Sequence, residues 1–327
     1  MIPRSLTLGV WLLLAAALVV DAAPVSAADR YALVITGASG GSPYKERYDA
    51  WRETLVKTFE QTFHYPADHI VVLAEEASET IRQATRENVR AVVGELRARL
   101  GQDDTLTVVL IGHGSSAGGD AAKFNLVGPD LTAAEWGALC RDLPGQLVFV
   151  NTSSGSFPFV EALSGRNHIV ITANDSAAQQ FETVFPEYFI ETLAGTSADT
   201  DKDGRVSVWE LFVAVADRVK RYYQENGQLA TERPLLDDNG DGIGREFDEP
   251  GPDGVLSRVA YFETAPEMAG TGDPERTALM RRRAQVLNDF EQLRAKKAQL
   301  PTAAYEDALE ALLLELARID RRLRAGS

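Results

Sequence analysis

Two polar stretches in this chain, each following an apolar run, could together supply a base and a nucleophile. The run 106–112 is followed by His113, and the run 146–151 is followed by Thr152 and Ser153. A histidine next to a hydroxyl is the pairing of general base and nucleophile that acyl-transfer enzymes use. These residue types therefore raise the question of a hydrolytic site built on His113 and one of the two hydroxyls.

The segments that carry these residues alternate between strand-like and helix-like patterns, which predicts an α/β fold with a mostly parallel sheet and helices on both faces. In such sheets, ligands bind beyond the carboxyl ends of the strands. Right-handed crossovers place strands separated by one helix side by side, which would bring His113 next to Thr152. The predicted strands are 31–36, 70–74, 106–112, 146–151 and 168–173, with helical patterns at 45–63, 88–100 and 132–141.

Polar residues also follow the first and the fifth predicted strands. Ser39 comes shortly after the first strand, within a glycine-rich turn, and Asn174 and Asp175 come directly after the fifth. Because carboxyl ends of parallel strands meet at one edge of a sheet, we expect these three residues to line the same cleft as His113. They are the candidates for binding a substrate or ligand.

The motifs "VVLIGHGSSAG" and "LVFVNTSSGSF" resemble the caspase-like clan of cysteine peptidases, nearest its legumain-type branch. The stretch "ITGASGGSPYKERYDAW" is similar to the first-strand turn of that branch, with Ser39 where the branch often has Asn. The resemblance covers about residues 31–193. It implies a catalytic histidine at His113, in a His-Gly-Ser motif, and a nucleophile after the fourth strand, in a Cys-x-Ser-Gly motif.

The chain departs from that pattern at the nucleophile, because Thr152 stands where the family has cysteine. The single cysteine, Cys140, lies in a helical pattern and is expected to be a buried apolar residue. A threonine hydroxyl gives up its proton far less readily than a thiol, because its alkoxide is far more basic than a thiolate. Threonine nucleophiles rely on their own N-terminal amine, which an internal residue lacks. We therefore expect a catalytically inactive homologue that binds a peptide or a partner protein.

Three other interpretations stay open on the sequence. The first is a Ser/Thr-dependent peptidase or hydrolase that uses Thr152 or Ser153 with His113. The second is an unrelated α/β binding domain with polar loops. The third is a structural calcium module that assembles through its helical tail.

The stretch "DTDKDGRVSVWE" matches the calcium loop of an EF-hand. A Gly at position 6 makes the sharp turn, and helical patterns flank the loop on both sides. An acidic solvated turn would explain neither that glycine nor the acid at position 12, so we expect a Ca²⁺ site. Its ligands at positions 1, 3, 5, 7, 9 and 12 would be Asp199, Asp201, Asp203, the Arg205 carbonyl, Ser207 and Glu210.

A second Asp-rich loop matches the same pattern less well. Asp237, Asn239 and Asp241 fall at positions 1, 3 and 5, and an acid, Asp248, falls at position 12. Gly244 and a nearby proline oppose a following helix. The stretch is either a half-site for calcium or a series of Asx turns. Both loops belong to a segment, 199–254, that reads as an insertion in the α/β domain.

The beginning of the chain and its charge indicate an exported, acidic protein. Residues 1–27 have a positive start at Arg4, an apolar run at 6–20 and a small-residue cleavage site, as in a signal peptide. The net charge is −15, which opposes binding to nucleic acid or anionic membrane. No later stretch is long and apolar enough to span a bilayer. We expect a periplasmic or extracellular location, with no membrane span after cleavage.

The predicted α/β domain covers 29–265, and a Gly/Pro-rich linker separates it from a helical tail at 274–325. Apolar residues repeat every seven positions from Leu279 to Leu300, Pro301 interrupts the pattern, and a second apolar seam follows. This pattern predicts two helices in an antiparallel coiled-coil hairpin. The hairpin would pack on itself or on the domain, or would join copies of the chain in a homo-oligomer.

Overall fold

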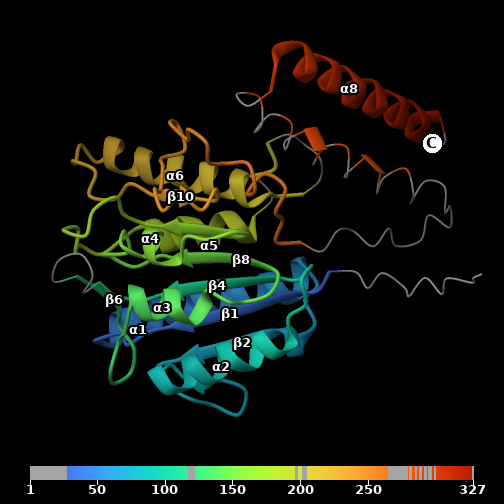
Figure 1. Cartoon of the computed structure of the whole chain (residues 1–327). Helices are drawn as coiled ribbons and strands as arrows, with labels where there is room; N and C mark the ends of the chain where they lie inside the picture. Colours follow the sequence, from blue (N-terminus) through green and yellow to red (C-terminus); the bar gives the residue numbers. More distant parts are fainter. Residues whose placement is uncertain are drawn as a thin grey trace, which may run out of the picture.

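The computed structural model describes residues 28–116, 122–195, 198–200, 205–263 and 300–325, together with isolated positions between 279 and 297. The predicted signal peptide, 1–27, lies outside the described residues. A seven-stranded sheet forms the centre of the molecule (Figure 1), with strand order β10-β9-β8-β4-β1-β2-β3. The strands are β1 (Arg30–Thr36), β2 (Ile70–Ala74), β3 (Arg82–Gln83), β4 (Thr105–Ile111), β8 (Gln146–Asn151), β9 (His168–Thr172) and β10 (Leu235–Asp237).

The sheet is parallel except for β10, which pairs with β9 in the antiparallel direction. All seven residues of β4 are buried. A strand buried on both faces has an almost unbroken apolar sequence, which is why the run at 106–112 does not alternate. The register pairs Leu110 of β4 with Asn151 of β8, so the two polar stretches after these strands begin side by side.

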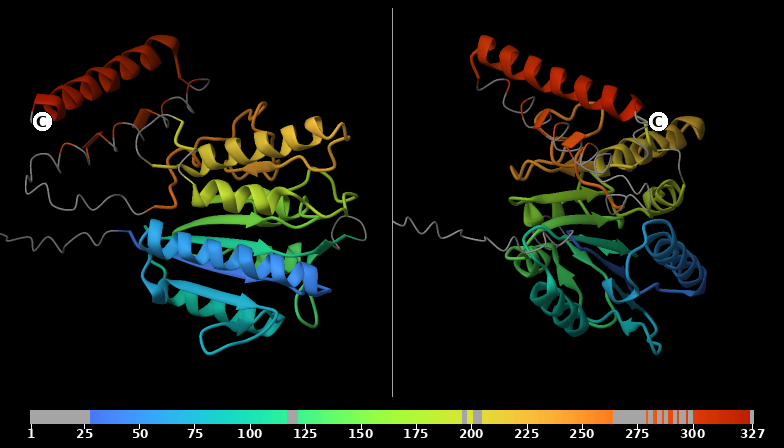
Figure 2. Two further views of the ribbon diagram at one scale, coloured as in Figure 1. Left: turned by 180° about the vertical axis from the view of Figure 1, so that it is seen from behind. Right: turned by 90° about the vertical axis from the view of Figure 1, so that its right-hand side faces the viewer.

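Helices cover both faces of the sheet (Figure 2), and each face has its own apolar core. One face packs against α1 and the pair α5 and α6; the other packs against α2, α3 and α4. The mostly parallel α/β architecture predicted from the sequence is therefore confirmed. The bounds are α1 (Ser42–Lys57), α2 (Arg86–Arg99), α3 (Ala133–Cys140), α4 (Phe159–Leu163), α5 (Phe185–Ala194) and α6 (Val208–Glu225), with a π-helical turn at Thr58–Thr62 and a 3-10 turn at Ala67–His69.

A small antiparallel sheet, which the sequence did not indicate, follows the carboxyl end of β4. It consists of β5 (Gly114–Ser115), β6 (Lys123–Phe124) and β7 (Leu131–Thr132). β7 leads directly into α3, which Thr132 and Glu135 begin with a reciprocal capping box. This sheet fixes the path of the chain after His113, because Gly114 pairs with Phe124.

In the described part of the tail, residues Thr302–Ala325 form the long helix α8. The first helix of the predicted hairpin falls on residues of which only some are described, so the hairpin stays a prediction. Arg282 from that segment donates to both carboxylate oxygens of Glu315 on α8, at 2.6 and 3.0 Å, and Val286 and Ile319 are buried. Among the described residues, no helix has the length and apolar character needed to cross a membrane.

Candidate functional site

The chain reverses its direction of winding between β1 and β4. From β1 it moves outward on one side to β2 and β3, and it then returns to β4 on the other side of β1. This point, at the carboxyl ends of the strands, is where open α/β sheets bind ligands. Ser39 follows β1 and His113 follows β4, so both residues lie after the carboxyl ends of strands, as predicted, and the strand order brings them to the switch point.

His113 is held by a main-chain contact across this switch point. Its Nε2 lies 3.1 Å from the carbonyl oxygen of Ser39. A carbonyl can only accept a hydrogen bond, so the neutral ring carries its proton on Nε2 and keeps a lone pair on Nδ1. His113 is therefore oriented with a basic nitrogen, Nδ1, on the side away from Ser39.

Two tyrosines of α1 pack against the same imidazole. The ring of Tyr44 meets that of His113 edge-on at 4.6 Å between centroids, and the ring of Tyr48 does so at 5.6 Å. The two tyrosines are four residues apart, which places them on one face of the helix. No motif in the sequence assigned them to the site, although their spacing directly after the first glycine-rich turn was a usable signal.

Thr152 occupies a closed position. Its side chain is 0% exposed, and its hydroxyl donates a hydrogen bond of 2.7 Å to the carbonyl oxygen of Leu110. The proton that a base would have to remove is thus given to the main chain. Cys140 is buried in α3, where burial raises the pKa of its thiol to about 12, as expected for an inert apolar residue.

The other two hydroxyls of this stretch are also engaged. Ser153 donates to the side-chain oxygen of Asn151 at 2.7 Å, and Ser154 donates to the carbonyl oxygen of Gly114 at 3.0 Å. Gly114 follows His113, so this last bond ties the two polar stretches together. A Cβ on Gly114 would lie 2.0 Å from the Ser154 carbonyl oxygen, so only glycine allows this approach.

Residues 176–183, which follow β9, lie over the Thr152 stretch. We call this segment the strap. Its Thr183 hydroxyl donates to the carbonyl oxygen of Thr152 at 2.7 Å, and its Gln179 carbonyl accepts from the main-chain N–H of Gly155 at 2.9 Å. These bonds close the strap over Thr152, the residue that the resemblance places at the nucleophile position. No sequence pattern indicated it.

Further contacts hold the middle of the strap to the rest of the rim. The amide of Gln180 donates to the carbonyl oxygen of Ser116, and Glu182 forms an ion pair with Arg47 of α1. Between these two anchored residues, Phe181 is 70% exposed. The rim therefore presents an aromatic side chain next to a covered site.

Asn174 and Asp175 lie at the carboxyl end of β9, as the sequence predicted, but they have different surroundings. Asn174 is buried. Its side-chain oxygen accepts two hydrogen bonds from Ser156, one from the hydroxyl at 3.0 Å and one from the main-chain N–H. Asp175 is partly buried and pairs with Arg233 at 3.8 Å. Asn174 thus supports the loop after β8 from within.

The described part of the predicted calcium loop leads into α6. Ser207 and Glu210 form the capping box of this helix, with Ser207 as N-cap. One carboxylate oxygen of Glu210 accepts from Ser207, and the other accepts from the N–H of Thr200 at 2.9 Å, so the carboxylate faces back over the loop. Asp199 and Arg205 are described and partly buried, whereas Asp201 and Asp203 lie outside the described residues.

In the described part of the chain, no group of three or more His, Cys, Asp or Glu side chains is arranged to hold a metal ion. The second Asp-rich loop is fully described. Asp237 is buried, and Asp248, its position-12 acid, pairs with Lys220 of α6 at 2.8 Å. Asp248 therefore faces α6 in this structure.

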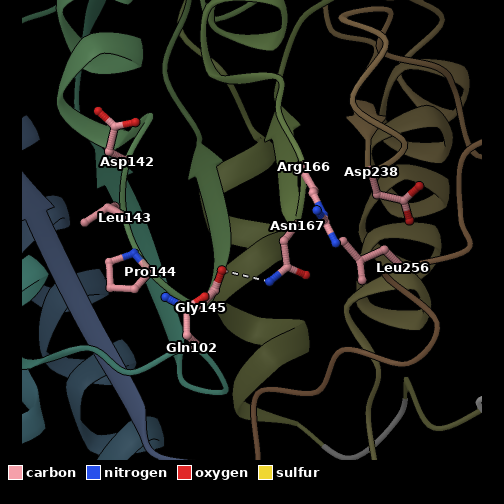
Figure 3. Close-up of a pocket in the computed structure, with 9 residues that line it drawn as sticks. All are labelled: Gln102, Asp142, Leu143, Pro144, Gly145, Arg166, Asn167, Asp238 and Leu256. Carbon is pink, nitrogen blue, oxygen red and sulfur yellow. Dashed lines mark hydrogen bonds between the residues drawn. The ribbon is translucent and has the colours of Figure 1, made fainter.

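A polar cavity of about 870 Å³ opens at the opposite, amino-terminal edge of the sheet (Figure 3). Asn167, at its centre, donates to the Gly145 carbonyl at 2.7 Å. The carboxylate of Asp238 accepts from the main chain of Gly254 and from Ser257, which leaves it committed to the fold. The residues that line the cavity are Gln102, Asp142, Leu143, Pro144, Gly145, Arg166, Asn167, Asp238 and Leu256. The histidine and hydroxyl chemistry lies at the other edge.

No family model and no curated protein matches the chain. A solved structure, that of a protein from Geobacter sulfurreducens, is similar at 13% sequence identity with a TM-score of 0.43, over 67% of this chain and 97% of that one.

Proposed function

We propose that this chain is a catalytically inactive relative of the caspase/legumain-like peptidases that binds a peptide or a partner protein. The observation that carries the proposal is the state of Thr152, which is fully buried and donates its hydroxyl to the Leu110 carbonyl. A nucleophile has to be reached by the substrate and deprotonated by a base. Neither condition is met by Thr152 or by Ser153, whose hydroxyl bonds to Asn151.

His113 is better suited to binding than to base catalysis in this setting. Its Nδ1 is an acceptor at the switch point, its ring lies against Tyr44, and Phe181 offers an exposed aromatic side chain on the strap. An acceptor flanked by aromatic rings suits a peptide with an amide N–H and an apolar side chain. We expect the occupant to lie across the rim without reaching Thr152.

The test is a peptide library that is read for both retention and cleavage. The wild-type protein should retain a subset of peptides containing apolar residues and should release them intact. His113→Ala and Phe181→Ala should each weaken retention. Leu229→Ala should not, because it changes an exposed side chain that is distant from both residues in the sequence. Retention that does not respond to either rim substitution would contradict the proposed site.

We also propose that the loop 199–210 binds Ca²⁺ as a structural ion. Supporting this, the Glu210 carboxylate faces back over the loop and its partner Ser207 begins α6, as the position-12 and position-9 residues of such a loop should. The ion would supply a positive charge that relieves repulsion among Asp199, Glu210 and the two aspartates between them. Extracellular calcium modules bind at about 10⁻⁴–10⁻³ M, which suits the exported location predicted from residues 1–27.

A further inference from the structure

The guanidinium of Arg245 lies among the oxygen atoms of the second Asp-rich loop, residues 237–248. Its Nη1 donates to the carbonyl oxygen of Ile243 at 2.9 Å, to Oδ1 of Asp241 at 3.3 Å and to the carboxylate of Asp253. Its Nη2 donates to Oδ2 of Asp241 at 2.7 Å. One carbonyl and two carboxylates, the oxygen ligands that calcium prefers, thus converge on a cation that belongs to the chain.

The loop is wound around this cation by its own side-chain to main-chain bonds. Asp237 accepts from the N–H groups of Gly240, at 3.0 Å, and Gly242, at 3.2 Å. Asn239 accepts from the N–H of Asp241 at 2.7 Å. The acid at position 1 thus holds the turn at the position-6 glycine, and the guanidinium of Arg245 lies against the acid at position 5.

Arg245 is fixed in place by the main chain as well as by its side chain. It forms a two-bond antiparallel bridge with the buried Leu236 of β10, at 3.0 and 2.9 Å. It stands at position 9 of the calcium-loop pattern, where the first loop has Ser207. The longer, charged residue at that position bonds to two groups that the pattern assigns as ligands, the Asp241 carboxylate at position 5 and the Ile243 carbonyl at position 7.

The charges of this cluster need a permanent partner. The Asp253 side chain is 1% exposed, and an unpaired buried carboxylate is strongly unfavourable. An arginine stays protonated at every ordinary pH and can bind two carboxylates at once through its planar fork. A calcium ion bound by the same oxygen atoms would lie against the guanidinium, and the two positive charges would repel each other.

We propose that Arg245 replaces the calcium ion of the second loop, so that the loop 237–248 folds without metal and binds none. Of the two alternatives that the sequence left open, a half-site for calcium and a series of Asx turns, this assigns the second and gives its physical reason. The inference concerns a different loop from the one proposed to bind calcium, and it holds whether or not the first loop does.

Calcium binding is best measured by titration calorimetry in a Glu210→Gln background, which silences the first loop. That variant should show no calcium binding. Adding Arg245→Ser, which gives the second loop the position-9 residue of the first, should create one site with a dissociation constant of about 10⁻⁴–10⁻³ M. A further Asp241→Asn should abolish it. Calcium binding by the Glu210→Gln variant that Asp241→Asn removes would overturn the proposal, as would a folded Arg245→Ser variant that gains no site.

A second measurement needs no substitution and covers the case in which Arg245→Ser fails to fold. Hydrogen exchange of the amides in 237–248 of the wild-type protein should be equally slow in calcium and in chelator. Loss of protection in this loop on chelation would overturn the inference. If the wild type binds no calcium at all, the proposal for the first loop fails, while the result for 237–248 is still read independently.

Discussion

The Nε2 of His113 lies 3.1 Å from the main-chain oxygen of Ser39, and this contact joins the carboxyl ends of β4 and β1. It leaves Nδ1 as the acceptor of the neutral ring, which packs edge-on against Tyr44 and Tyr48 of α1. The site therefore retains an oriented histidine. The two hydroxyls considered as its partners, those of Thr152 and Ser153, are both buried and donate to other acceptors.

Thr152→Cys should place a thiol in the nucleophile position that alkylating reagents reach slowly. The reason is burial under the strap, which bonds to Thr152 through Thr183 at 2.7 Å. Adding Thr183→Val removes that bond and should speed up alkylation. The rate is measured by mass spectrometry with iodoacetamide in excess.

The same experiment has an internal control in Cys140, which is buried with its thiol pKa raised to about 12 and should stay unmodified. Wild-type protein should therefore show no labelling. Alkylation of the Thr152→Cys variant at the rate of an exposed thiol, unchanged by Thr183→Val, would mean that the strap does not cover the site.

Gly114→Ala should destabilise the protein by about 1–3 kcal/mol, the usual cost of overpacking. The new Cβ would lie 2.0 Å from the Ser154 carbonyl oxygen and would force the two polar stretches apart. The matched control is Gly94→Ala in α2, where nothing lies within 4 Å. That change should stabilise the helix by about 0.5–1 kcal/mol. Urea unfolding measures both, and equal effects would argue against the close contact.

Calcium should raise the melting temperature of the wild-type protein, and Glu210→Gln should abolish the rise. At a hundredfold excess of calcium over its dissociation constant, one site adds about 2.7 kcal/mol. Magnesium should have little effect, because it demands a tighter octahedral geometry. Differential scanning calorimetry in millimolar calcium and in chelator makes the comparison.

The choice of glutamine separates the ion from the helix cap. Glutamine at the third helical position preserves the capping box with Ser207, so the metal-free stability of Glu210→Gln should be close to that of the wild type. Ser207→Ala removes the cap and should cost about 1 kcal/mol even in chelator. Identical melting curves in calcium and chelator would rule out the site.

Glu232 should make stability fall as the pH rises. Its buried carboxylate accepts from the N–H groups of Val184 and Phe185, at the start of α5, and from the Tyr223 hydroxyl. Burial outweighs these bonds and raises the pKa of Glu232 above its ordinary value of 4.5. A group whose pKa is raised on folding stabilises the protein below its unfolded pKa, and this contribution is lost as the pH rises through the folded value.

The free energy of unfolding of the wild type, relative to that of Glu232→Gln, should therefore be highest below pH 4.5 and should decline above it. The difference between the two proteins isolates this carboxyl from the other acids of the chain. A difference that instead grows as the pH rises towards 4.5 and is constant above it would show that the hydrogen bonds outweigh burial.

Local sequence was sufficient to predict the five strands β1, β2, β4, β8 and β9, and the position of His113 after β4. The apolar runs at 70–74 and 146–151 coincide with β2 and β8, because buried parallel strands have an unbroken apolar sequence between turn residues. β10 was missed because only three residues form it, and its antiparallel pairing with β9 depends on a return of the chain from a distant segment.

The state of the site could not be predicted, because long-range contacts determine it. Nothing in the letters around Thr152 shows that its hydroxyl bonds to Leu110, 42 residues earlier, or that Thr183 covers it. The role of Arg245 could not be predicted for the same reason, because its partner Asp253 lies outside the calcium-loop pattern at 237–248. Residue types and spacing locate candidate groups, whereas the partners of those groups depend on the tertiary structure.

The proposed lack of catalysis can be measured by incubating the wild-type protein, in calcium and in chelator, with a mixed peptide library and a hydroxyl-directed covalent probe. Thr152→Ala and Ser153→Ala serve as matched variants. We expect no cleaved peptide and no covalent adduct for any of the three proteins. Cleavage or labelling by the wild type that disappears in Thr152→Ala or Ser153→Ala would contradict it and would establish a hydrolase.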